Sequence, residues 1–182
     1  SNVEQVTLLA RITTLLRSNH SHIRWRATRL FQLVVRHPSL LLNTSHIANC
    51  LAALVKIMES KCYIQDELNP SQRELICLKA TVESVDFAMD RIRGKANLTR
   101  EVLTPKISGI IGCLIGLIKI LPNEVIPVLY KLILAHSNTF RPFGTKLENE
   151  LLTILSNGVN VDRLSPMVLD SSLKCLALLS FN

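Results

Sequence analysis

The stretch Ile107–Leu121, written ISGIIGCLIGLIKIL, decides the fold class of this protein. Its apolar residues cover nearly the whole circumference of a helix instead of one stripe, which predicts a helix enclosed by others. Ser108, Gly109 and Lys119 interrupt the run, which is too short to cross a bilayer. We therefore expect the central helix of a soluble domain that makes no membrane contact.

The overall composition favours the same class. Of the 182 residues, 48% are hydrophobic but only 4% are aromatic, because Leu, Ile, Val and Ala dominate. Sheet proteins draw more heavily on aromatic and β-branched residues, whereas this palette suits helices packed side by side. The prediction is an all-α protein.

Apolar periodicity and turn residues predict eight helices in four consecutive hairpins. The first helices of the hairpins start near residues 3, 45, 105 and 142, a spacing that brackets the roughly 40 to 47 residues of HEAT and armadillo units. We expect stacked antiparallel hairpins in a HEAT/armadillo-like α-solenoid, a single domain over residues 1–182 that is a fragment of a longer protein. A compact bundle of the same helices is the alternative. The expected helices span residues 3–17, 21–36, 45–58, 71–92, 105–121, 122–134, 142–155 and 165 onward.

Prolines and a capping motif suggest where several of these helices begin. Ser71 and Glu74 fit a capping box, in which each side chain satisfies a free amide of the first turn. Pro105 is expected at the first helical position and Pro127 in the first turn of its helix, where the missing N–H is tolerated.

Basic residues gather near the N-terminus, where six arginines face a single acidic residue, Glu4, in residues 1–50. In the helix 21–36, the expected buried face holds Ile23, Ala27, Leu30, Phe31 and Val34. In such a group the arginines can bind phosphates and the tryptophan can stack on a base. The tryptophan can equally pack against the next hairpin. The candidate residues for binding a partner or a nucleic acid are Arg24, Trp25, Arg26, Arg29 and Arg36.

Catalytic and metal-binding motifs are missing from the sequence. It contains no glycine-rich phosphate loop, no GxSxG and no HExxH, and Glu148 and Glu150 stand two residues apart, pointing to different sides of a helix. The five cysteines are odd in number, widely spaced and mostly set in apolar helical faces, which favours a reducing compartment. None forms CxxC, and His46 with Cys50 does not complete a zinc shell. We expect neither an enzyme nor a cofactor.

The connector 139–146, written TFRPFGTK, is unusually rich in aromatic and basic residues. We expect Phe140 and Phe143, held by Pro142, to fill the junction between the third and fourth hairpins. Arg141 and Lys146 would then cap carbonyls or contact a partner.

The segment Leu98–Leu151 resembles the fungal Rix family of pre-ribosomal-RNA-processing proteins, subunits of the Rix/Ipi complex. The resemblance covers about a third of the chain and implies a helical, non-enzymatic scaffold rather than a catalyst. The residues that carry it are Thr99, Arg100, Glu101, Pro105, Lys106, Pro127, Phe140, Arg141, Pro142, Phe143 and Lys146.

The resemblance also implies a cellular role. It predicts a nuclear protein, in nucleoplasm and nucleolus, that takes part in assembly of the large ribosomal subunit (pre-60S) and in processing of the second internal transcribed spacer. The implied partners are a WD-repeat subunit, a second helical-repeat subunit, the pre-60S particle and an AAA ATPase remodeller. The alternative is an RNA- or chromatin-binding adaptor that uses the N-terminal basic face.

Overall fold

A computed structural model describes residues 2–36, 51–52, 54–56, 58, 72–92, 100–157 and 162–180. The described residues form helices and turns and contain no strand, so the predicted all-α class is confirmed. The chain divides into two compact units, residues 1–106 and 107–182. The expectation of one domain over residues 1–182 stays a prediction.

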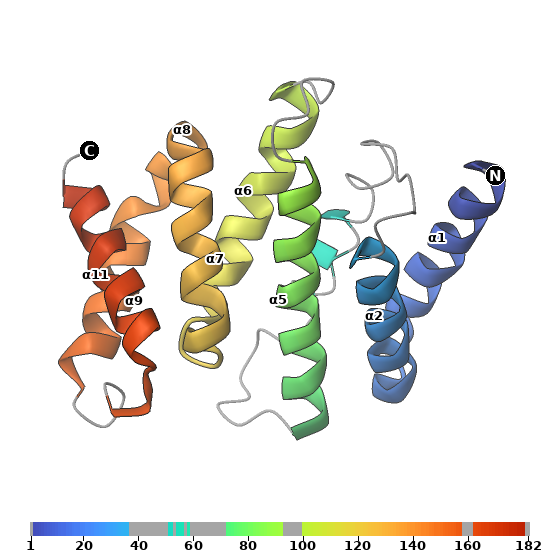
Figure 1. The fold of residues 1–182 in the computed structure, drawn as a ribbon, viewed down its shortest axis with the longest axis horizontal. Helices are drawn as coiled ribbons and strands as arrows, with labels where there is room; N and C mark the ends of the chain where they lie inside the picture. Colours follow the sequence, from blue (N-terminus) through green and yellow to red (C-terminus); the bar gives the residue numbers. More distant parts are fainter. Residues whose placement is uncertain are drawn as a thin grey trace. The chain divides into compact units, whose positions relative to one another are not determined.

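In the first unit, helix α2 lies between two other helices. Helix α1 (Asn2–Leu16) and α2 (Ser21–Arg36) form an antiparallel hairpin, and α2 also packs along α5 (Gln72–Ile92) (Figure 1). Gln32 bonds to Glu83, and Arg36 stacks on Phe87 one turn further along both helices, so α2 and α5 run parallel. Corresponding helices of successive repeats are related in this way, which confirms the stacked-hairpin prediction.

Only part of the third predicted helix is described. Leu51, Leu54, Val55 and Met58 are buried, as the pattern 45–58 predicts. The start of that helix and Ser71 of the predicted capping box lie outside the described residues.

The central stretch forms most of α6 (Arg100–Leu117) and the turn after it. The prediction of an enclosed helix is confirmed, because seven apolar side chains of the stretch are at most 1% exposed. These side chains are Ile107, Ile110, Ile111, Leu114, Ile115, Leu117 and Ile118.

Two proline predictions are wrong. Helix α6 begins at Arg100, so Pro105 lies inside it, and Pro127 lies inside α7 (Pro122–Ala135), whose first position holds Pro122. A proline removes only one backbone bond, the one to the carbonyl four residues earlier. Inside a helix this loss and the clash of the ring cost about 3 kcal/mol or more. Around Pro127 the burial of Val125, Ile126, Val128 and Leu129 outweighs that cost.

In the second unit, α7 and α11 (Pro166–Ser180) lie side by side, and α9 (Gly144–Ser156) also contacts α11 (Figure 1). Asn123, at the start of α7, accepts a 3.2 Å hydrogen bond from the N–H of Ser165, just before α11. The two helix starts are therefore adjacent and the helices run parallel. The Ser165 hydroxyl accepts a bond from the N–H of Val168, which confirms the predicted start of this helix.

The connector before α9 is helical. It contains the short helix α8 (Ser137–Phe140) and the 3-10 turn η1 (Arg141–Phe143), and α9 begins at Gly144 instead of the predicted Pro142. Successive helical pieces satisfy the backbone groups that a polar loop would leave to water.

Cys175 is buried in the second unit, and this burial affects the reactivity of its thiol. Burial raises the pKa of its thiol to about 12 from an ordinary 9.0. Because the folded state holds this proton at a pH at which the unfolded chain loses it, the Cys175 contribution to stability falls as pH rises between these values. At about pH 9 we expect iodoacetamide to label Cys175 only after unfolding, as measured by peptide-resolved mass spectrometry. Labelling without denaturant at the rate of the unfolded chain would contradict this packing.

Candidate interaction sites

The buried face of α2 differs from the predicted one. Ala27, Phe31 and Val34 are buried as expected, but Leu30 is 41% exposed and Arg24 only 6% exposed, so the prediction for Leu30 is wrong. The buried arc includes polar side chains that have partners, such as Thr28, whose hydroxyl donates to the Arg24 carbonyl. A partnered polar side chain can be buried at little cost, and hydrophobicity alone does not reveal which ones are partnered.

The buried Arg24 stabilises the turn of the first hairpin. Its guanidinium donates a 2.9 Å hydrogen bond to the carbonyl of Ser18, in the turn between α1 and α2. A charge-assisted bond to a turn carbonyl stabilises the turn and compensates for burial of the guanidinium. Arg24 therefore does not share the exposed side of α2 with the other arginines.

Two of the exposed arginines are tied to neighbouring side chains. Arg29 donates a 2.8 Å bond to the Gln32 carboxamide, which in turn donates to Glu83 on α5. The Arg36 guanidinium lies 4.5 Å from the ring centre of Phe87, a cation–π contact. These contacts link α2 to α5, so both arginines have a structural role whatever else they bind.

Trp25 is half-buried, and its Nε1 atom is enclosed without an acceptor among the described residues. An indole in this position contributes mainly packing area, since its N–H is shielded from solvent. Of the five candidate residues, Arg26, Arg29 and Arg36 are exposed, and their predicted binding role stays a prediction.

In the aromatic pair of the connector, Phe140 lies in the interior of the second unit and Phe143 is half-buried. Phe140 is 1% exposed and meets Phe143 edge to face, with ring centres 6.4 Å apart. A Cβ placed on Gly112 would lie 3.5 Å from the Phe143 ring, so this ring packs against α6. Arg141, Pro142 and Lys146 of the same stretch are exposed.

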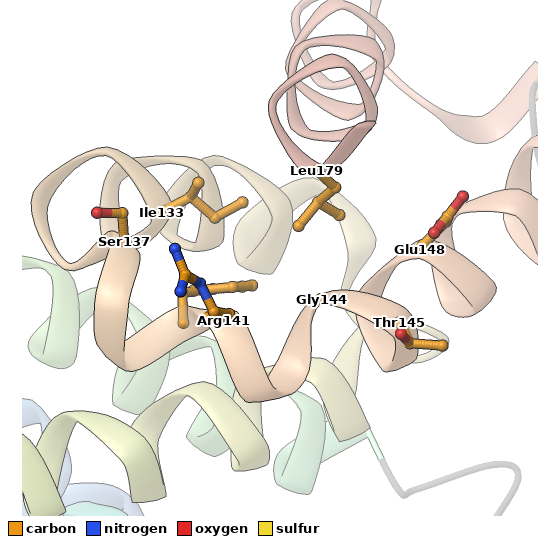
Figure 2. A pocket seen from close by; sticks show the side chains of 8 residues that line it. Ile133, Ser137, Arg141, Gly144, Thr145, Glu148 and Leu179 are labelled. Carbon is orange, nitrogen blue, oxygen red and sulfur yellow. The ribbon is translucent and has the colours of Figure 1, made fainter. Parts of the chain in front are cut away.

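A small pocket of about 140 Å³ lies beside this pair (Figure 2). Figure 2 shows Ile133, Arg141 and Leu179 gathering around it, with Ser137 on one side and Glu148 on the other. Its volume is below the roughly 300 to 1,000 Å³ of small-molecule sites, so it suits one side chain better than a metabolite.

A second hollow of about 440 Å³ lies near the start of α7. Its wall includes Lys119, Glu124 and Arg163, but the groups nearby act structurally: Lys119 is 3.9 Å from Glu150, and Asn123 bonds the segment before α11. Among the described residues no three potential metal ligands cluster, and no helix has the length and apolarity to span a membrane. His46 and Cys50 lie outside the described residues.

The other residues of the resemblance are spread over α6 and α7. Pro105 is exposed, while Lys106 and Pro127 are half-buried. Arg100 and Glu101 lie in the first turn of α6, but their side chains, like all of Thr99, are outside the described part of the chain.

Comparison with known proteins agrees with these observations. The RIX1 family, described as rRNA processing/ribosome biogenesis, matches residues 1–160. The chain belongs to the RIX1 family. The match extends beyond the resembling segment Leu98–Leu151 to both hairpins of the N-terminal half.

Curated RIX1 relatives cover most of this chain but are much longer. The pre-rRNA-processing protein RIX1 of Scheffersomyces stipitis is 36% identical over 81% of the chain and 19% of its own length. The Candida albicans protein of that name is 32% identical over 83% of the chain and 20% of its own length. That of Saccharomyces cerevisiae is 28% identical over 81% of the chain. The chain thus spans about a fifth of the relatives it matches.

One solved structure shares the fold of this RIX1 chain. It is titled as the Rix1 subcomplex of a Rix1-Rea1 pre-60S particle, and it matches with a TM-score of 0.83 at 26% identity. The match covers 97% of this chain and 32% of the solved one. The described helical fold is therefore shared with about a third of one chain in that solved structure.

The α2–α5 linkage predicts a stability effect for Gln32. Replacing Gln32 by Ala leaves the enclosed side of Glu83 without its donor, so we expect the free energy of unfolding to fall by about 1–3 kcal/mol. Arg26→Ala, an exposed change on the same helix, serves as the matched control and should stay within about 0.5 kcal/mol. Urea unfolding followed by circular dichroism measures both, and equal effects would show that the linkage contributes nothing.

The connector predicts a larger effect. Phe140→Ala combined with Phe143→Ala should lower the melting temperature and cost at least about 3 kcal/mol, because one fully buried ring and one half-buried ring are lost. Arg141→Ala combined with Lys146→Ala, both at the surface, should leave the melting temperature nearly unchanged. Unchanged stability of the phenylalanine variant with lost partner binding would instead make the connector a contact surface.

Proposed function

We propose that this chain is a non-enzymatic scaffold module of the Rix/Ipi complex in large ribosomal subunit assembly. Family membership over residues 1–160 supports a role in ribosome biogenesis and pre-rRNA processing. The strongest support is the structural similarity to a chain of a Rix1-Rea1 pre-60S particle, with a TM-score of 0.83.

The arrangement of charged side chains supports scaffolding as the mode of action. Arg24 holds a turn, Arg29 with Gln32 joins two helices, and Lys119 lies next to Glu150. Groups committed to such contacts maintain a fold and do not converge on a reacting atom. A stack of hairpins offers long outer faces, which suits the binding of several proteins at once.

The proposed partners are a WD-repeat subunit and a second helical-repeat subunit of the complex, the pre-60S particle and an AAA ATPase remodeller. The proposed location is the nucleus, in nucleoplasm and nucleolus, and the proposed step is processing of the second internal transcribed spacer. Since the chain spans about a fifth of its relatives, other regions of a full-length protein would share these contacts.

The alternative is an RNA- or chromatin-binding adaptor that uses the exposed side of α2. The exposure of Arg26, Arg29 and Arg36 favours it, because clustered guanidinium groups attract phosphates. Two of these three arginines already stabilise the contact with α5, so the scaffold proposal is the stronger one.

Cosedimentation tests the scaffold proposal. The tagged chain, added to a fungal nuclear extract, should move in a sucrose gradient with particles that contain precursor rRNA of the large subunit. The Phe140→Ala, Phe143→Ala variant should lose this association in proportion to its loss of fold, while Arg141→Ala should keep the fold. A folded native chain that stays at the top of the gradient, away from precursor rRNA, would contradict the proposal.

A further inference from the structure

The first hairpin exposes four leucines that its own helices do not cover. Leu8 and Leu15 on α1 are 40% and 44% exposed, and Leu30 and Leu33 on α2 are 41% and 61% exposed. Single exposed leucines are common on soluble proteins, but a group of them on one pair of helices marks an interaction site.

These leucines lie on one side of the hairpin. At about 100° per residue, Leu30 and Leu33 fall within one narrow arc of α2 together with Arg26. On α1, Leu8, Arg11 and Leu15 fall in another narrow arc, which borders the buried residues of that helix.

The packing of α2 decides how the two arcs are related. Gln32 and Arg36 face α5, and α2 lies between α5 and α1 (Figure 1). Because α1 runs antiparallel to α2, the leucine arc of α1 then turns toward the same open side as Leu30 and Leu33. We name Leu8, Leu15, Leu30 and Leu33 with their arginine neighbours the leucine–arginine surface.

The charge of this surface is positive. Arg11 on α1 and both Arg26 and Arg29 on α2 are exposed beside the leucines. Glu4, one turn before Leu8, is the only acidic residue in residues 1–50. A ligand that fits must therefore be both apolar and negatively charged along its length.

We propose that the leucine–arginine surface binds an acidic amphipathic helix of a partner protein. Leucine-like side chains at successive helical turns of such a helix would pack against the exposed leucines, and its flanking carboxylates would pair with Arg11 and Arg26. The proposal goes beyond the scaffold function, which does not depend on it.

Single-stranded RNA fits this surface less well. Phosphates would pair with the arginines but would leave the four leucines in water, so no gain comes from apolar burial. Unspecific RNA binding also relies on aromatic platforms for the bases, and the nearby Trp25 is half-buried with an enclosed Nε1.

Fluorescence anisotropy with a defined peptide tests the proposal. The probe is a labelled synthetic helix of roughly four turns, with leucines along one stripe and glutamates on the other faces. A second peptide of identical composition scatters the leucines around the helix and so keeps charge and hydrophobicity constant. The native chain should bind the striped peptide at least about tenfold more tightly than the scattered one.

Two matched variants locate the binding. Leu33→Ser should remove most of the preference for the striped peptide, while Leu173→Ser, at a leucine of equal exposure on α11, should leave it intact (61% and 60% exposed). Arg26→Glu should weaken binding of both peptides, more so at low salt, because it removes attraction and leaves shape unchanged. Circular dichroism confirms that each variant is folded, since all three positions are exposed.

Three outcomes would overturn the proposal. One is equal affinity for the two peptides, which would reduce the interaction to charge alone. Another is a folded Leu33→Ser variant that binds the striped peptide as tightly as the native chain. The third is single-stranded RNA of equal charge displacing the striped peptide at physiological salt, which would assign the surface to nucleic acid. The gradient experiment on ribosomal precursors is unaffected by any of these, so the two proposals fail separately.

Discussion

A helix hairpin in a repeat fold cannot bury its apolar face alone, so it needs a neighbouring hairpin. Helix α2 satisfies this need by packing along α5, and α7 does so by packing along α11. In both pairs the helices run parallel, which lets equivalent faces of successive hairpins meet. The buried stretch Ile107–Ile118 shows how far this enclosure extends on one helix.

Polar bonds between the packed helices determine how the helices are aligned. Apolar contacts alone permit sliding, whereas Gln32 reaches Glu83 and Asn123 reaches Ser165 only at one offset along the helices. A slipped arrangement would leave the buried Gln32 donor without its acceptor, which costs more than the small net gain of a formed bond. The buried polar residues of α2 thus contribute specificity of alignment more than stability.

Much of the fold was predictable because apolar periodicity reports burial directly. The enclosure of residues 107–121 and the start of the last helix at Ser165–Pro166 followed from local patterns. The starts of α6 and α9 did not, because neighbouring packing overrides the weak signal of one proline. Burial of Arg24 depends on the Ser18 carbonyl in the turn before α2, and exposure of Leu30 depends on which sides of α2 are packed. A helical wheel of α2 contains neither piece of information.

The residues that identify the family are not those of the surface proposed to bind a partner. This difference has a physical reason. Phe140 of the connector is buried and packs on the half-buried Phe143, so the identity and spacing of the two are constrained along one short segment that is easy to recognise. A surface built from two helices draws its side chains from positions about twenty residues apart, such as Leu8 and Leu30. Only the fold brings these side chains together, so no local sequence motif indicates such a site. In stacked hairpins, binding surfaces of this kind are therefore found through exposure and charge on the folded chain.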